Sequence, residues 1–136
     1  MHRSIQIRGI VFAAIAVILG AFGAHALKAL LPLDRLQVFE TGVRYQIIHA
    51  IALIVLSLAM VNAKKYEHSD LATKWMQRAA LFMTIGIVLF SGSLYLIATS
   101  SILPFTLGAW VGPITPLGGL FFITGWTCWG IASYRG

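Results

Sequence analysis

The sequence predicts an all-α integral membrane protein, a four-helix bundle that forms one domain over residues 1–136. Of its 136 residues, 59% are apolar and only 10% are Asp, Glu, Lys or Arg, whereas soluble domains carry about 25% charged residues. This number of charges is too small to cover the surface of a water-exposed globule. The apolar surface must therefore face lipid or other protein. Three long windows without any charged residue are the second observation.

These charge-free windows define four membrane spans. About 20 apolar residues are needed to cross roughly 30 Å of hydrocarbon, so windows 9–27 and 45–63 each fit one helix. The window 79–134 is too long for one crossing, and helix breakers lie near its middle. Those breakers are Pro104, Gly112, Pro113 and Pro116. The predicted spans are 9–27, 45–63, 79–98 and 117–133, and the uncharged loop 99–116 is expected in the outer interface.

The second helix is expected to begin well before its membrane span. Pro32 and Asp34 are typical of a helix start, and only Gly42 interrupts the helical pattern that follows up to residue 46. Helix 2 is therefore extended by an amphipathic interfacial start. Glu40 and Arg44 lie four residues apart on it and can form an ion pair.

Charge placement predicts the orientation. Four spans put both termini and the second loop on one side, and the basic residues favour that side by seven to three. The seven are Arg3, Arg8, Lys64, Lys65, Lys74, Arg78 and Arg135; the three are Lys28, Arg35 and Arg44. Because Lys and Arg are retained on the cytoplasmic side, we expect a multi-pass protein of the cell inner (cytoplasmic) membrane with both termini cytoplasmic.

A few polar side chains remain inside the spans, where they are costly and need a reason. Counted from the cytoplasmic helix ends, the rise is roughly 24 Å to His25 and to Tyr95, and roughly 21 Å to His49. These three side chains are therefore predicted to share one polar layer in the outer third, which the backbone of Gly118 and Gly119 also reaches. The candidate site residues are His25, Glu40, Thr41, Arg44, Tyr45, Gln46, His49, Ser91, Ser93, Tyr95, Pro113, Gly118 and Gly119.

Two functions fit this layer. In the first, it binds a small ligand, a lipid head group or a proton: the histidines exchange protons near neutral pH, Glu40 and Arg44 stand at the mouth, and residues 113–119 cap the site. In the second, the layer is a purely structural network in an accessory or assembly subunit of a larger membrane complex, since hydrogen bonds between helices themselves stabilise packing. Direct contacts between the side chains favour the second function; enclosed ligand or water favours the first.

Other chemistries lack the residues they need. Every Asp and Glu lies in a loop or interface, and Ser91-Gly92-Ser93 is more typical of close helix packing than of a nucleophile, so we predict no catalytic residue and no enzyme. Two intramembrane histidines and the single Cys128, interpreted as a packing residue, predict no metal or other cofactor. The +6 net charge orients the spans and does not indicate nucleic acid. Expected partners are membrane lipid, and a homo-oligomer or a larger membrane complex.

Four segments carry a family resemblance: GAFGAHAL at 20–27, FETGVRYQIIHAIAL at 39–53, FSGSLYL at 90–96 and GPITPLGGLFFITGW at 112–126. Together they resemble the YgdD/YwdK-like family of small bacterial inner-membrane proteins. The resemblance implies a four-helix membrane protein whose biochemical role is unassigned, and it supplies no substrate. Its motif positions coincide with the polar layer.

Overall fold

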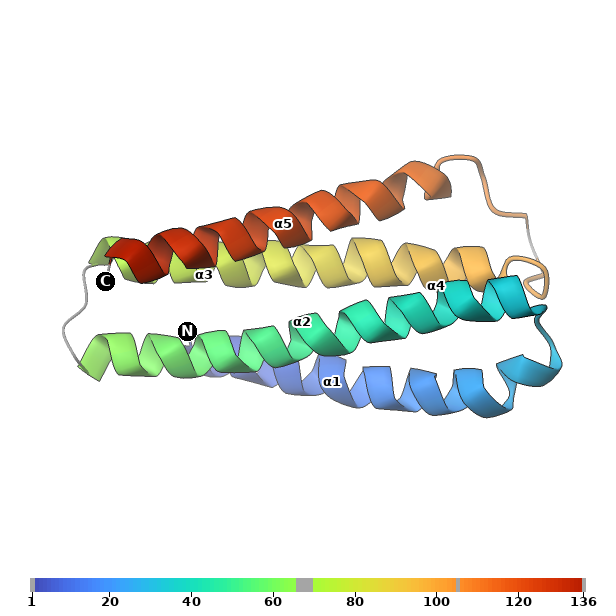
Figure 1. Ribbon diagram of the computed structural model, residues 1–136, viewed down its shortest axis with the longest axis horizontal. Coiled ribbons are helices and arrows are strands. Elements are labelled where there is room, and N and C mark those ends of the chain that lie inside the picture. The colour runs from blue at the N-terminus through green and yellow to red at the C-terminus, as the bar shows by residue number, and fades with distance from the viewer. Residues whose placement is uncertain (1, 66–69, 105, 136) are drawn as a thin grey trace.

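A computed structural model describes residues 2–65, 70–104 and 106–135 of the chain. The chain forms four long helical rods, and consecutive rods run antiparallel to each other (Figure 1). The described residues contain no strand. In chain order the elements are α1 (His2–His25), the 3₁₀ turn η1 (Leu27–Ala29), α2 (Leu33–Lys65), α3 (Asp70–Gly86), the π-helical segment η2 (Ile87–Ser91), α4 (Gly92–Thr99) and α5 (Val111–Arg135). Because α3, η2 and α4 follow one another without a break, they form one rod, called here the third span. The all-α prediction is confirmed.

Each rod is long and apolar enough to cross a membrane. The four segments are His2–Ala29, Leu33–Ala63, Asp70–Thr99 and Val111–Arg135. The two ends of the chain lie toward the same end of the bundle, as an even number of crossings requires (Figure 1). These observations confirm the four-span membrane bundle.

Three helices begin before their predicted spans, and the first of them, α1, starts at His2 rather than at residue 9. Helix α5 begins at Val111, although the prolines led us to start the fourth span at residue 117. Pro113 falls in the first turn, where a backbone N–H would have no helical partner in any case. Pro116 stays inside the helix, as membrane helices tolerate. The third span begins at Asp70 rather than at residue 79, because a helix does not end where its apolar stretch ends.

Helix α2 confirms the predicted extension. It starts directly after Pro32, whose carbonyl oxygen accepts the backbone N–H of Leu36 at 3.0 Å. Leu36 and Phe39 are buried, together with Leu27 and Ala98, in a small core at the end opposite the termini. The first turns of α2 therefore pack against the end of the third span.

The rods pack in a series. Helix α1 lies along α2, α2 contacts the third span, and α5 lies along the third span, so α1 and α5 are the outer members of the series (Figure 1). Gly9 makes α1 and α2 approach closely, since a Cβ there would lie 2.8 Å from the carbonyl oxygen of Ala50. Two of the described side-chain bonds reach beyond a neighbour in the series. Arg8 Nη1 of α1 donates to Thr84 Oγ1 of α3 at 3.2 Å, and Trp126 Nε1 of α5 donates to His49 Nε2 of α2 at 3.1 Å.

The main core fills the half of the bundle nearer the termini. Its buried members include Leu53 and Leu56 of α2, Met83 of α3 and Phe122 of α5. Cys128 belongs to the same cluster and is buried. Its predicted role as a packing residue is confirmed.

Candidate functional site

Gln46 lies at the centre of the buried polar residues. Its side chain is 3% exposed. Its Nε2 donates to the carbonyl oxygen of Phe12 at 2.9 Å, and its Oε1 accepts the hydroxyl of Tyr95 at 2.9 Å. One amide thus ties together α1, α2 and α4.

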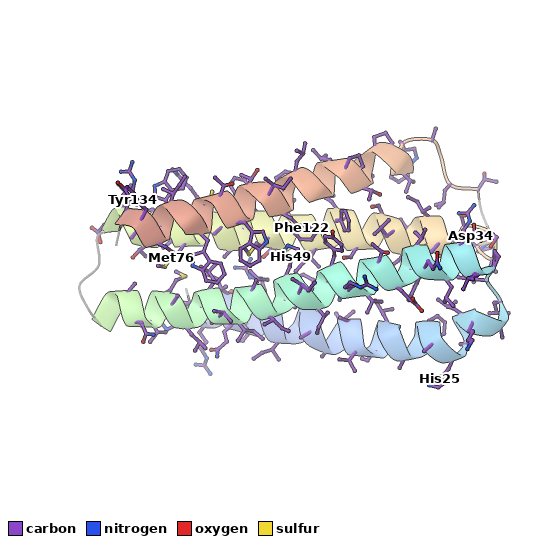
Figure 2. All side chains as sticks on the ribbon, viewed as in Figure 1. His25, Asp34, His49, Met76, Phe122 and Tyr134 are labelled. Atoms are coloured by element: carbon purple, nitrogen blue, oxygen red, sulfur yellow. The ribbon has the colours of Figure 1, made fainter. Side chains whose placement is uncertain are left out.

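His49 makes a second tie, one turn further along α2. Its Nδ1 donates to the carbonyl oxygen of Tyr45 at 2.8 Å, and its Nε2 accepts the indole N–H of Trp126 at 3.1 Å. Because an indole nitrogen can only donate, Nε2 carries no proton in this arrangement and the hydrogen is on Nδ1. The imidazole also stacks on Phe122 with ring centroids 3.5 Å apart (Figure 2). Both ring nitrogens and one ring face are occupied by protein.

The two predicted serines also bond to neighbouring helices. Ser91 Oγ donates to the carbonyl oxygen of Gly42 at 2.8 Å, and Ser93 Oγ lies 2.7 Å from Thr115 Oγ1 of α5. Next to them, Gly118 is buried where a Cβ would collide with the backbone of Phe90. Helix η2 is therefore held closely between α2 and α5.

His25 does not join this network, so the prediction of one shared level is wrong. It is exposed at the end of α1 and points away from the other helices (Figure 2). Gly23 packs on Phe39, and from Phe39 to His49 the rise along α2 is about 15 Å. The two histidines are thus at different depths and on different surfaces. The depth count assumed that all helices start level, whereas Gly9 lies beside Ala50 and not beside Ala63.

The remaining predicted residues lie around the network. Glu40 and Arg44 are exposed, and no ion pair joins them within the described part of the chain. Thr41 Oγ1 donates to Gln37 O within its own helix at 2.9 Å. Tyr45 packs its ring on Phe90 and is 40% exposed. Pro113 is exposed in the first turn of α5, and Gly119 makes only an ordinary contact with Phe90.

Sequence reasoning missed several partners of the network. The Phe12 carbonyl could not be found, because any backbone position can accept a bond. Trp126 had a weak signal, since it is a hydrogen-bonding side chain inside the predicted last span, whereas Thr115 was placed in the loop 99–116. Arg35 was counted only as a flanking charge, yet it donates to the carbonyl oxygen of Ile97 at 2.7 Å.

The two histidines are expected to differ sharply in their effect on stability. Replacing His49 by phenylalanine removes the acceptor of the Trp126 indole and is expected to lower the free energy of unfolding by about 1 to 2 kcal/mol. His25→Phe, the matched control at an exposed position, is expected to change it by less than about 0.5 kcal/mol. Unfolding in detergent micelles, followed by circular dichroism, measures both. Equal effects would contradict the placement of His49 inside the bundle.

Known proteins match the sequence of this chain over nearly its whole length. Residues 19–119 match the family described as "Protein of unknown function (DUF423)". The chain is 40% identical to the UPF0382 membrane protein YwdK of Bacillus subtilis, over 95% of this chain and 94% of the relative. It is 35% identical to the UPF0382 inner membrane protein YgdD of Escherichia coli, over 93% of this chain and 88% of the relative. No solved structure matches the chain significantly. This chain therefore belongs to the DUF423 family and is a small multi-pass membrane protein similar to YwdK and YgdD.

Proposed function

We propose that this protein is an accessory subunit that packs against a transmembrane helix of a larger membrane protein. The observation that carries the proposal is the direct pairing of the buried polar side chains with protein groups. Gln46 uses both ends of its amide, and His49 uses both ring nitrogens. Such pairing supports a structural network, and a function exerted through the outer surface of the bundle.

The hydrogen bonds of these buried side chains argue against the alternative of a ligand or proton site. A group that binds a ligand must exchange its protein partner for the ligand, which leaves that partner unpaired at a cost of about 1 to 3 kcal/mol. For Gln46, the partners left behind would be the Phe12 carbonyl and the Tyr95 hydroxyl. The same residues therefore support a fixed bundle better than an exchange site.

The outer face of α5 offers a surface for another helix. Thr124, Thr127 and Gly130 are exposed on neighbouring turns. Both threonine hydroxyls donate to carbonyl oxygens of α5 itself, at 2.8 and 2.9 Å, so they need no lipid or water partner. A Cβ on Gly130 would meet nothing within 4 Å. Small residues of this kind let helix backbones approach closely in membranes, and we define these three residues as the docking face.

The exposed face of α1 differs from that of α5. Its small residues Gly9, Ala16 and Gly23 are buried, and Gly9 and Gly23 lie against α2. Its exposed small residues are the alanines Ala14, Ala21 and Ala24. The side of α1 away from α2 presents branched side chains such as Val17 and Ile18, which are exposed. This face is typical of lipid contact, and it makes a matched control.

Site-specific photo-crosslinking in the native membrane tests the proposal. A photoreactive residue at Thr127 is expected to form an adduct with a distinct polypeptide, and one at Ile18 is not. Gly130→Leu should abolish the Thr127 adduct, because the added side chain separates the helices. Extraction into native lipid discs should then give a particle that contains this 14.8 kDa chain and the crosslinked polypeptide. A chain found only as a monomer, or crosslinked only to its own copies, would contradict the proposal.

A further inference from the structure

Two adjoining cavities lie between the third span and the start of α5, at the end of the bundle opposite the termini. One, of about 540 Å³, is lined by residues that include Ser100, Thr106 and Gly112. The other, of about 370 Å³, is lined by residues that include Val88 and Gly92. Val111 lines both cavities, so they are neighbours.

One cavity is more polar and the other is apolar, as the head group and the acyl chains of a lipid are. The first presents the hydroxyl of Thr106 and that of Ser100, which already donates to the carbonyl oxygen of Ile97 at 2.8 Å. The second is walled mainly by aliphatic side chains such as Leu96 and Ile114. From Ser100 back to Val88 the helical rise is about 18 Å, close to the roughly 15 Å of hydrocarbon in one leaflet. The pair of cavities therefore suits an amphiphile whose polar end lies at the membrane surface.

Gly92 opens the apolar cavity. A Cβ at this position would meet no other atom within 4 Å, whereas a Cβ on Gly118 would collide with Phe90. Gly118 is thus required for contact between protein helices, while the space beside Gly92 is not filled by the described protein. This space is available to a chain that is not part of the protein.

Arg35 places a positive charge next to the polar cavity, through its hydrogen bonds to two of the residues that line it. It is half-buried, and its Nη1 donates to the carbonyl oxygen of Ile97 at 2.7 Å and to Ser100 Oγ at 3.2 Å. Both residues line that cavity. No carboxylate among residues 2–65, 70–104 and 106–135 forms an ion pair with Arg35. A guanidinium has five N–H donors, so those on Nε and Nη2 remain for an anion, and phosphate matches their planar geometry.

We propose that this site binds one phospholipid of the leaflet at the end opposite the termini. The lipid phosphate lies beside Arg35 and Ser100, and one acyl chain follows the groove past Gly92. The site uses neither the docking face nor the network around Gln46 and His49. The lipid site can therefore be tested independently of the proposed function.

Native mass spectrometry of the delipidated protein in detergent, titrated with phosphatidylglycerol, tests the site. Wild-type protein is expected to retain one phosphatidylglycerol per chain. At Gly92 an added Cβ meets nothing within 4 Å, so Gly92→Leu places its side chain in the groove and should weaken this binding by about tenfold or more. Gly130→Leu, a matched change at another open glycine, should bind as the wild type does. Circular dichroism verifies that both variants keep the helical fold, and equal binding by the Gly92→Leu variant and the wild type would overturn the proposal.

Two further titrations separate a lipid from its parts. Diacylglycerol, which has the acyl chains without the phosphate, should bind about tenfold or more weakly than phosphatidylglycerol. Arg35→Gln should remove that preference. Inorganic phosphate should not displace the lipid, because it gains nothing from the groove. Displacement by phosphate, or equal binding of diacylglycerol, would overturn the assignment to a phospholipid.

Discussion

Replacing Gly118 by alanine is expected to lower the free energy of unfolding by about 2 to 3 kcal/mol. The new methyl group would collide with the backbone of Phe90. A backbone cannot rotate away as a side chain can, and η2 is held on its other side by the bond from Ser91 to the Gly42 carbonyl. Helix α5 must therefore move outward, which also loosens the contact between Ser93 and Thr115.

Gly119→Ala is the matched control, because Gly119 directly follows Gly118 and is also a glycine inside α5. A Cβ there would lie 3.8 Å from the Phe90 ring, an ordinary contact. Alanine also favours the helix by about 1 kcal/mol relative to glycine, so this variant should be as stable as the wild type or more stable. Thermal unfolding in one detergent measures the difference. A Gly118→Ala protein as stable as Gly119→Ala would show that η2 and α5 are not in close contact.

Gln46→Leu is expected to be the most damaging change in the polar network, with a loss of about 2 to 3 kcal/mol. The leucine fills a similar volume but accepts and donates nothing. The Phe12 carbonyl and the Tyr95 hydroxyl both lose their bond to this side chain. Removing one residue therefore weakens the ties of α2 to both α1 and α4.

A double-mutant cycle separates the two bonds. Tyr95→Phe removes only the hydroxyl and should cost about 1 kcal/mol in the wild-type background. In the Gln46→Leu background the same change should cost close to nothing, because the hydroxyl has already lost its acceptor. Unfolding of all four proteins in the same micelles measures the coupling. Strictly additive losses would mean that Tyr95 and Gln46 are not bonded to each other.

The membrane fold could be predicted from sequence because hydrocarbon imposes both helix length and the absence of charge. Window 45–63 lies within α2, and window 9–27 runs along α1 to His25 and ends in the 3₁₀ turn η1. Window 79–134 covers most of the third span and nearly all of α5. The helix ends could not be predicted in the same way. Pro113 and Pro116 lie inside α5 because a helix start and a membrane helix both accept proline.

The buried polar residues could be predicted because burial in a membrane makes them rare and costly. Gln46, His49, Ser91 and Ser93 are all buried and hydrogen-bonded. Their partners depend on how far each helix is shifted along its neighbour, and a single sequence does not contain that shift. His25 was placed wrongly for this reason.

The serial packing of the four rods divides the molecule into two halves, and the contacts within each half differ from the contacts between the halves. Within the half formed by α1 and α2, and within the half formed by the third span and α5, glycines such as Gly9 and Gly118 bring the backbones together. Across the seam between the halves, polar bonds from Arg8, Arg35, Tyr95 and Trp126 recur along the length of the bundle. Each half can thus enter the bilayer as a self-contained hairpin during synthesis. The hydrogen bonds between the two hairpins then determine how the hairpins align, which apolar packing alone would not determine.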